Sequence, residues 1–231
     1  MRVAALYDVH GNLPALEAVL ADVEREAPDL IVFGGDVAAI GPFPRETIDL
    51  LRSLPNARFV MGNADREDLP ELSGERRAFV AAFEPTVRVE VDGLGPTLFC
   101  HGSPRSDEEI VTRATPDEAV AEMVEAVGEQ VIVLGHTHMP FDRQVGTHRV
   151  VNAGSVGMPY EAQPGAYWAL LGPDVELRRT DYDLEAAAAR MRATGAPQVE
   201  EFVTENVLTV PTAEEAIQVF ERQAGRAVRI P

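Results

Sequence analysis

The stretch Val131-Ile-Val-Leu-Gly-His136-Thr-His138-Met139 decides the fold that this sequence predicts. Four apolar residues followed by a glycine are typical of a central strand that ends in a turn. The carboxyl ends of such strands are where open α/β sheets place their functional sites. Residues two apart in an extended segment point to the same face, so we expect His136 and His138 to reach one cleft.

Strand and helix patterns alternate through the first two thirds of the chain, which favours a largely parallel sheet. The expected strands there are Arg2–Tyr7, Asp29–Phe33, Ala57–Met61, Arg88–Val91, Thr97–Cys100 and Gln130–Leu134. The expected helices are Leu13–Glu26 with Asn12 as its cap, Arg45–Leu54, Glu75–Phe83, and one that runs from a Thr115 cap to about Val127. Residues 68–85 are charged and mixed, and we expect them to form a partial lid.

The pattern changes after the strand that ends at Leu134. Three short strands without intervening helices favour antiparallel pairing, in a second sheet or a second half: His148–Val151, Gly165–Leu171 and Val175–Thr180. Two more helices are expected, at Leu184–Arg192 and Thr212–Gln223, whereas residues 197–211 are expected to be a connector. We expect a single domain of residues 1–231, with a motif-bearing core of 1–180 and a C-terminal helical segment of 183–231.

The amino-acid composition limits where the protein is expected to act and what it is expected to bind. The chain has 231 residues and only one cysteine, Cys100, so no intrachain disulfide is possible and a cytoplasmic location is expected. No apolar run reaches the length of a membrane span, and the N-terminus lacks a signal-peptide pattern. The net charge of −18 argues against binding to nucleic acid or anionic membranes. It is compatible with a small anionic substrate held by bound metal.

Five short segments that each follow an apolar strand carry metal-capable side chains: Asp8-Val-His10, Gly35-Asp36, Gly62-Asn63, His101-Gly102 and Gly135-His136-Thr-His138. Imidazole and carboxylate ligands suit Mn, Fe, Zn, Co or Ni better than Ca. The segments offer more ligands than one tetrahedral ion needs. Two ions fit better, with one carboxylate bridging them at a separation of about 3.5–4 Å.

These motifs, in this order, resemble those of the calcineurin-like metallophosphoesterases. The family pattern is D-x-H, G-D, G-N-H-D or E, H, and G-H-x-H. The segment Asn152-Ala-Gly-Ser-Val-Gly157, and Gly41-Pro42 with Arg45-Glu46, resemble the small bacterial phosphodiesterase-like branch. The resemblance extends to about residue 180. It implies an α/β fold of two packed mixed β-sheets flanked by helices.

The resemblance also implies a ligand set. Asp8, His10, Asp36 and His138 would hold a first ion; Asp36, Asn63, His101 and His136 would hold a second. Asp36 would bridge them. Two divalent ions are therefore expected as cofactors, manganese first, with Fe, Zn, Ni, Co or Mg as the other choices. Two cations lower the pKa of a shared water, and the resulting hydroxide attacks phosphorus. Asp36, Asn63 and His101 would be catalytic by holding that hydroxide and the phosphate.

One position departs from the family pattern. Where the family carries a histidine proposed to protonate the leaving group, this chain has Ala64. We therefore expect weak activity on esters with poor leaving groups, because positioned acid–base groups typically contribute about 10²–10⁴-fold. Asp65 is expected to form a turn, or a hydrogen bond to a metal-ligating histidine.

Other residues have two open readings. Arg45 and Arg66 lie near ligand loops in the sequence, where each either contacts phosphate or has a solvated or structural role. Ser155 bonds either a ligand or, as we expect, a backbone group. Cys100 and Trp168 are expected to be core residues.

The sequence therefore predicts a dinuclear metal-dependent phosphoesterase that acts on phosphodiesters or small phosphate esters. Close alternatives are a dinucleoside polyphosphate hydrolase and a protein phosphatase. A more distant alternative is a catalytically weak interaction scaffold of the same fold, as in the eukaryotic retromer. Ala64 favours the scaffold, and the intact ligand set opposes it. The expected partner is a small phosphate-containing substrate, and the sequence leaves the oligomeric state open.

Overall fold

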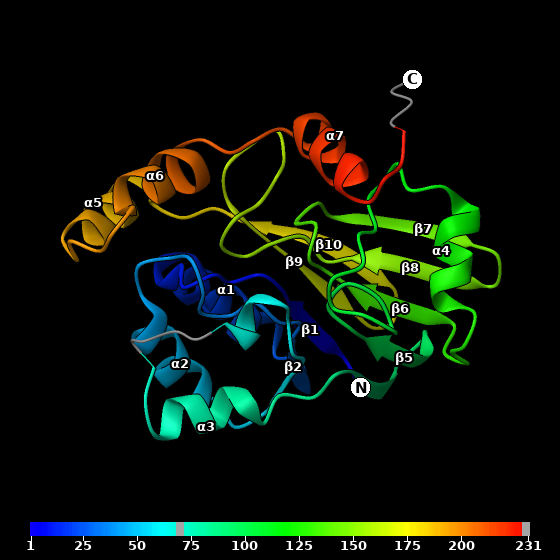
Figure 1. Ribbon diagram of the computed structural model, residues 1–231. Coiled ribbons are helices and arrows are strands. Elements are labelled where there is room, and N and C mark those ends of the chain that lie inside the picture. Colours follow the sequence, from blue (N-terminus) through cyan, green and yellow to red (C-terminus); the bar gives the residue numbers. More distant parts are fainter. Residues whose placement is uncertain (68–71, 228–231) are drawn as a thin grey trace.

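Two mixed β-sheets of five strands each pack face to face, with helices on their outer sides (Figure 1). The computed structural model describes residues 1–67 and 72–227. The first sheet has the order β10-β9-β1-β2-β3, from β1 (Val3–Leu6), β2 (Leu30–Phe33), β3 (Ala57–Phe59), β9 (Ala166–Leu171) and β10 (Val175–Thr180). The second has the order β4-β5-β6-β8-β7, from β4 (Val87–Val91), β5 (Gly95–Phe99), β6 (Val131–Leu134), β7 (Phe141–Val145) and β8 (His148–Asn152).

The helices are α1 (Leu13–Glu26), α2 (Pro44–Arg52), α3 (Glu75–Ala81), α4 (Asp117–Val124), α5 (Leu184–Arg192), α6 (Val199–Val203) and α7 (Ala213–Gln223). A 3₁₀ turn, η1 (Ala64–Arg66), and a π-helical turn, η2 (Thr204–Leu208), complete the elements. This architecture confirms the fold that the sequence resemblance implied. No helix in the described part of the chain is long and apolar enough to cross a membrane.

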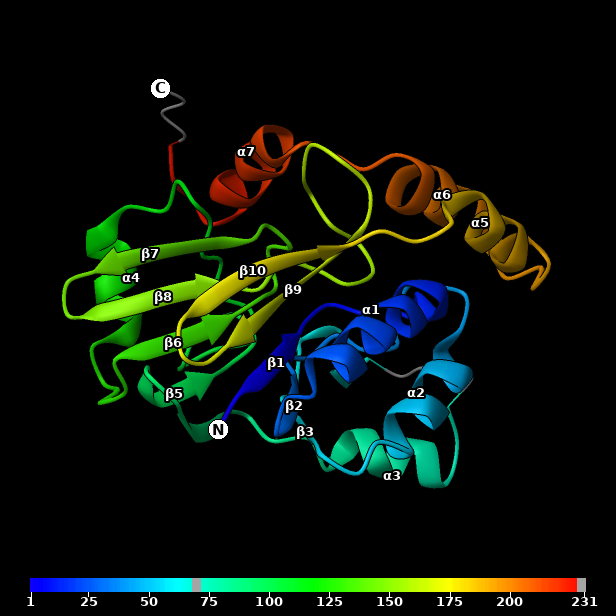
Figure 2. The same ribbon diagram turned by 180° about the vertical axis from the view of Figure 1, so that it is seen from behind.

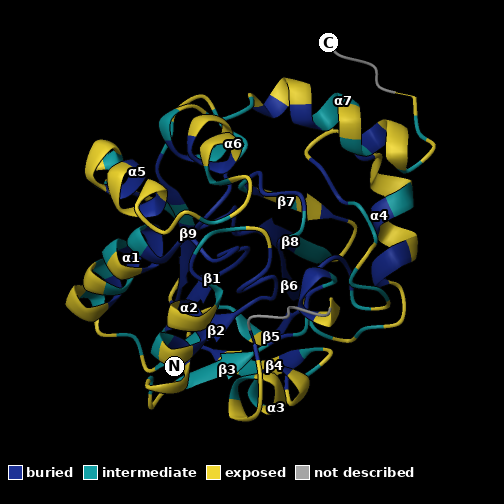
Figure 3. Ribbon diagram, turned by 60° about the vertical axis from the view of Figure 1, so that its left-hand side comes forward, coloured by how far each residue is buried: buried dark blue, intermediate teal, exposed yellow. Residues whose placement is uncertain are grey.

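Apolar side chains that alternate along the central strands separate the core into layers. On β1, Val3 and Ala5 face the second sheet, whereas Ala4 and Leu6 face α1 and its neighbours. The strand is buried on both faces, as expected for a strand covered by a sheet on one side and by helices on the other. In Figure 3 the central strands are dark blue, and the helices show yellow on their outward sides.

The expected parallel core is confirmed. β1, β2 and β3 are parallel, and so are β5, β6 and β8. The expectation for the later strands was wrong in part. β8 pairs parallel with β6, and its antiparallel partner is the unpredicted strand β7. β9 and β10 are antiparallel as predicted, and they join β1 in the first sheet (Figure 2). Strand β7 was not predicted because its three middle residues, Asp142-Arg143-Gln144, are polar and only its two end residues are buried.

Two local predictions were also wrong. Residues 197–211 are not a loose connector: they contain α6 and η2, whose Phe202, Val203 and Val207 are buried against Leu13 and Phe43. The second concerns α4, which begins at Asp117 without a side-chain cap and ends at Val124.

Thr115 does not cap α4 because its hydroxyl is engaged elsewhere. It accepts a hydrogen bond from the Thr112 N–H and donates one to Glu221. The predicted cap of α1 is confirmed, since the Asn12 side chain accepts from the Ala15 N–H.

The helix expected at Glu75–Phe83 is confirmed as α3, which ends at Ala81. Its Val80 and the following Phe83 are buried in the core with α1 and α2. Residues 68–71, part of the expected lid, lie outside the described residues.

Helix α7 is fixed to the second half of the molecule through Glu221, which is only 2% exposed. Its Oε1 accepts hydrogen bonds from the Thr112 hydroxyl at 2.6 Å and the Thr115 hydroxyl at 2.5 Å. The Arg226 guanidinium donates to both carboxylate oxygens and to the Ile110 carbonyl. The carboxylate therefore joins α7 to the segment that precedes α4.

Replacing Glu221 by alanine should lower the free energy of unfolding by about 2–4 kcal/mol, because two buried hydroxyls and a guanidinium lose their acceptor. Denaturant titration of the variant and the natural chain measures the difference. Glu24→Ala, which removes an exposed carboxylate from the last turn of α1, is the control and should change stability by less than about 0.5 kcal/mol. Equal stability of the two variants would contradict the anchoring role of Glu221.

Candidate metal centre

The carboxyl ends of parallel strands from both sheets meet at one edge of the sandwich. Asp8 and His10 follow β1, Asp36 follows β2 and Asn63 follows β3; from the second sheet, His101 follows β5, and His136 and His138 follow β6. The structure therefore brings together all the residues that the sequence selected as candidate ligands. Most of them are buried: Asp8, His10, Asp36, His101 and His138 are each at most 6% exposed.

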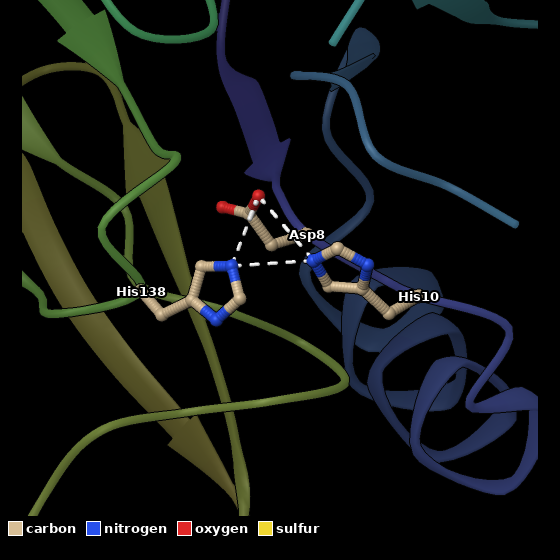
Figure 4. Close-up of side chains that lie close together, drawn as sticks. All are labelled: Asp8, His10 and His138. Carbon is tan, nitrogen blue, oxygen red and sulfur yellow. Dashed lines mark hydrogen bonds and ion pairs between the residues drawn. The ribbon is translucent and has the colours of Figure 1, made fainter. Parts of the chain in front are cut away.

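Asp8, His10 and His138 form a first cluster with the geometry of a metal site (Figure 4). The Nε2 atoms of the two imidazoles are 3.2 Å apart. Asp8 Oδ1 lies 3.4 Å from His138 Nε2 and 3.9 Å from His10 Nε2. The three ligand atoms point toward one another, so they enclose a point that a small cation can occupy.

A second cluster is formed by Asp36, His101 and His136, whose ligand atoms lie within 4.8 Å of one another. Asp36 Oδ2 is 3.3 Å from His101 Nε2, and Asn63 Oδ1 is 3.1 Å from the same nitrogen. Asp36 Oδ2 is also only 3.9 Å from His10 Nε2 in the first cluster. The carboxylate of Asp36 therefore lies between the two clusters.

The imidazoles are oriented by backbone carbonyls. The Nδ1 atoms of His10, His101 and His138 lie 3.3, 2.8 and 2.6 Å from the carbonyl oxygens of Ala39, Gly34 and Met158, respectively. A carbonyl can only accept, so Nδ1 carries a proton and Nε2 faces the clusters. Metal-ligating histidines in proteins are usually held in this way.

One buried carboxylate oxygen indicates that a cation fits in the first cluster. Asp8 Oδ1 has no hydrogen-bond partner among the described residues, although the side chain is fully buried. The other oxygen, Oδ2, accepts from the His136 N–H at 3.0 Å. A buried carboxylate oxygen without a donor is costly, and a cation that also binds the facing Nε2 atoms removes this cost. The donor set therefore fits divalent metal in the first cluster.

The pKa values of the imidazoles also bear on whether these side chains can bind metal. Burial and the neighbouring His138 lower the pKa of His10 to about 4, and burial with His101 lowers the pKa of His136 to about 4. Both rings are thus neutral at pH 7, as ligands must be. Burial also opposes charge on His101, but the carboxylates of Asp36 and Asp8 outweigh it and raise the pKa of His101 to about 10. A cation at His101 Nε2 must displace that proton. The affinity for metal should therefore decrease as the pH is lowered.

The two carboxylates of the clusters are ionised. Burial disfavours their charge, but His138 lowers the pKa of Asp8 and His101 lowers the pKa of Asp36 below the ordinary range. Two negative charges therefore face the imidazoles at neutral pH. This is the charge distribution that a pair of divalent cations would neutralise.

Asp65 fixes the loops that carry the second cluster. Its Oδ2 accepts from the N–H groups of Asp36 at 2.8 Å and Gly62 at 3.0 Å, and its Oδ1 accepts from the N–H of Val37 at 2.9 Å. Burial and the nearby Asp36 raise the pKa of Asp65 to about 7, while the N–H donors favour its ionised form. The expected hydrogen bond from Asp65 to a histidine is absent among the described residues. Asp65 holds the ligand loops through their backbone instead.

Five candidate ligands have left-handed backbone conformations, which are rare for residues other than glycine: Asp8, His10, Asp36, His136 and His138, with φ of 53°, 47°, 53°, 63° and 61°. The expected reason why both histidines after β6 reach the site was therefore wrong. The segment is not extended, and each histidine turns its ring inward through a positive φ. Sharp turns directly after each strand aim the side chains at the clusters.

Glycines permit the close approach of these turns. A Cβ on Gly62 would lie 2.1 Å from Asp36 Oδ1, and a Cβ on Gly135 would lie 2.6 Å from Asp8 Oδ2 and 2.3 Å from Tyr7 Cδ1. Any side chain at these positions would displace a candidate ligand.

The remaining predicted residues have varied environments. Ser155 bonds backbone groups, as expected: its hydroxyl donates to the Asp8 carbonyl and accepts from the Met158 N–H. Arg66 pairs with Asp107 at 2.9 Å and Glu108 at 2.8 Å, so a phosphate would compete with these carboxylates. Arg45 is exposed in the first turn of α2.

Cys100 and Trp168 are fully or almost fully buried, which confirms both as core residues.

Two aromatic residues next to the site were not predicted from the sequence. The Tyr160 ring stacks on His138, with centroids 4.8 Å apart, and the Phe220 ring lies 6.2 Å from that of His136. Tyr160 lies in the β8–β9 loop and Phe220 on α7, far apart in the sequence. The Phe220 position matched the apolar face of a helix, which is a packing signal and carries no information about the site.

Comparisons with known proteins agree with this geometry. Residues 1–172 match the family model of the calcineurin-like phosphoesterase superfamily domain. The chain is 25% identical to an uncharacterised protein of Methanocaldococcus jannaschii, over 85% of this chain and 94% of that protein. A metallophosphoesterase from Sphaerobacter thermophilus superposes with a TM-score of 0.72 at 29% identity, covering 88% of this chain and 97% of that one. A hypothetical protein from Pyrococcus horikoshii shares the fold, with a TM-score of 0.76, 20% identity, and coverage of 88% and 96%.

Replacing Asp65 by asparagine should weaken the affinity for Mn²⁺ about 10–100-fold, because an NH₂ group would face at least one backbone N–H and loosen the ligand loops. Titration of metal-free protein with Mn²⁺ measures this. Asp117→Asn, which changes an exposed carboxylate on α4, is the matched control. An Asp65→Asn protein that binds Mn²⁺ like the control would show that the backbone hydrogen bonds do not position the ligands.

Proposed function

We propose that this chain, which belongs to the calcineurin-like phosphoesterase superfamily and is a metal-dependent phosphoesterase, uses two divalent cations to hydrolyse phosphodiesters or small phosphate esters. The observation that carries the proposal is the pair of clusters that share Asp36. Asp8, His10 and His138, with Asp36, would hold one cation. Asn63, His101 and His136, with Asp36, would hold the other.

Bound divalent cations supply Lewis acidity, which lowers the pKa of water and offsets negative charge on the phosphate. The residues of the chain provide the geometry. Backbone carbonyls fix the imidazoles, and Asp65 fixes the loop of Asp36. Because the ligands are held before substrate arrives, little reorganisation is needed during the reaction.

Proton delivery to the leaving group is the step for which this chain lacks a residue at the family position. Ala64 is buried, and its N–H donates to Asp36 Oδ1 at 2.8 Å. Its methyl group cannot donate a proton. The leaving group must then depart unprotonated or take its proton from water. This favours activated esters and phosphoanhydrides over alkyl esters.

Manganese is the expected metal, because imidazole and carboxylate ligands together suit it, with Fe, Zn, Ni, Co or Mg as alternatives. The net charge of −18 supports a small substrate over nucleic acid. A cytoplasmic location is part of the same proposal and follows from the single Cys100. Dinucleoside polyphosphates contain phosphoanhydride bonds, which need a proton donor at position 64 less strongly than alkyl esters do. They are therefore the second candidate class of substrate.

Asp36→Asn should reduce kcat/KM for bis(p-nitrophenyl) phosphate with Mn²⁺ by at least about 100-fold, because one residue serves both clusters. Bound manganese should fall in the same protein, as measured by elemental analysis. Glu24→Gln, an exposed change on α1, should retain both values. Full turnover by Asp36→Asn, or natural protein that binds no metal after purification with Mn²⁺, would rule out the two-metal mechanism.

Ala64→His should restore a proton donor and so change the dependence on the leaving group. We expect kcat/KM for a phenyl ester to rise by about 10-fold or more, while that for a p-nitrophenyl ester changes by only a few-fold. Because Ala64 is buried, thermal unfolding of the variant is measured alongside. Ala64→Gln, which adds bulk without an acid, is the matched variant and should show no such difference. Equal increases in kcat/KM for both esters would show that the histidine does not act by protonating the leaving group.

A further inference from the structure

Helix α7 brings an aromatic side chain to the edge of the metal clusters. Phe220 lies 6.2 Å from the His136 ring, and Tyr160 stacks on His138 at 4.8 Å with an interplanar angle of 19°. The two aromatic rings are themselves 6.0 Å apart and tilted by 45°. In Figures 1 and 2, α7 lies beside the yellow-green loop that joins β8 to β9. Neither aromatic ring supplies a ligand atom to the metal clusters.

Tyr160 and Phe220 also line a cavity of about 310 Å³, which we call the α7 cavity. Its other walls include Ala216, Val219, Glu215 and Gln223. Val219 is 51% exposed, so the cavity opens to solvent on one side. The volume lies at the lower end of the range for small-ligand sites, about 300–1,000 Å³. Tyr160 and Phe220 lie beside His138 of the first cluster and His136 of the second, so the cavity adjoins the clusters.

The charges around the α7 cavity indicate which part of a substrate it takes. Among the described residues that line it there is no arginine, lysine or histidine, and Glu215 contributes a carboxylate. That carboxylate is already engaged, since it accepts from the N–H and the hydroxyl of Thr212. A phosphate would be repelled here, so the cavity suits the uncharged part of a phosphate ester.

The cavity offers both a stacking surface and a polar group. Aromatic rings attract other rings at centroid distances of about 4.5–7 Å. The Tyr160 hydroxyl has no hydrogen-bond partner within residues 1–67 and 72–227, so it can donate a hydrogen bond to a ligand. The Gln223 amide adds a donor and an acceptor at the same cavity. A planar heterocycle can use all of these groups, whereas an alkyl chain uses only the apolar surface.

The wall that carries Phe220 is held firmly. The next residue, Glu221, binds the hydroxyls of Thr112 and Thr115. The carbonyl of Val111, next to Thr112, accepts from the hydroxyl of Thr137, the residue between the two histidines after β6. α7 and the ligand loop are thus fixed to one segment, so the aromatic wall keeps its position relative to the clusters.

We propose that Tyr160 and Phe220 form a subsite for a planar aromatic group, such as a nucleobase, of the ester whose phosphate lies at the two clusters. The proposal rests on the proposed function, because it needs phosphate to bind at the metals. It adds a preference for nucleoside phosphates, set by a helix that lies beyond the residues matched by the family model.

The experiment compares adenosine 5′-monophosphate with ribose 5-phosphate, which carries a hydroxyl in place of the base. Binding of each to Mn²⁺-loaded full-length protein is measured by calorimetry, under conditions in which chromatography shows no conversion. Stacking of one base predicts that the adenosine compound binds about 5- to 150-fold more tightly. In Phe220→Ala the two affinities should become equal within about 3-fold, while that for ribose 5-phosphate stays unchanged.

Two further variants separate the subsite from the stability of α7. Phe220→Trp keeps a stacking surface and should retain the preference for the base. Ile217→Ala shortens a residue of the same helix that packs with Met139 and does not line the cavity, so it should also retain the preference. Equal affinities in the natural protein, or an unchanged ratio in Phe220→Ala, would overturn the subsite.

The same data distinguish this failure from failure of the proposed function. If ribose 5-phosphate binds only when Mn²⁺ is present, and the base adds nothing, the metal site stands and the subsite is wrong. If neither compound binds and bis(p-nitrophenyl) phosphate is not hydrolysed, the proposed function is wrong and the subsite is overturned with it.

Discussion

The buried carboxylate of Asp8 is the constraint on which the rest of the site depends. It follows the central strand of the first sheet, yet its Oδ2 holds the backbone of His136 in the second sheet. Its other oxygen faces the imidazoles of His10 and His138 without a hydrogen-bond donor among the described residues. Leaving such a group unpaired costs about 1–3 kcal/mol, and more when it is charged. The fold therefore closes on a position that a cation would satisfy.

The two sheets are fixed to each other at this same edge. The Tyr7 hydroxyl, next to Asp8, donates to the Val133 carbonyl of β6 at 3.0 Å. The hydroxyl of Ser155 donates to the Asp8 carbonyl, and the Asn152 amide donates to the Gly135 carbonyl at 2.8 Å. These polar contacts lie directly beneath the ligand turns. The packed sandwich sets the separation of the clusters, and the polar contacts set their orientation.

Much of this could be predicted from the sequence because the signals are local. A short apolar run followed directly by a polar residue, or by glycine and a polar residue, marks a strand end, and this signal placed the candidate ligands at one edge. Strand β7 was missed because the interior of Asp142–Gln144 carries no apolar pattern. The helices between residues 197 and 211 were missed because prolines at both ends suggested a connector. The engagement of Thr115 by Glu221 joins residues more than a hundred positions apart, which no local pattern can show.

The backbone of the ligand turns bears on whether the site is used for chemistry. Each non-glycine residue in a left-handed conformation costs about 1–3 kcal/mol and persists only where the surrounding structure imposes it. Here the conformation occurs at Asp8, His10, Asp36, His136 and His138, so the fold carries several such costs in one place. An interaction scaffold uses its outer surface and needs none of them. The strain is accounted for if aiming ligands at metal is what these turns do, and the loss of a histidine at Ala64 then alters which leaving groups react without removing the metal chemistry.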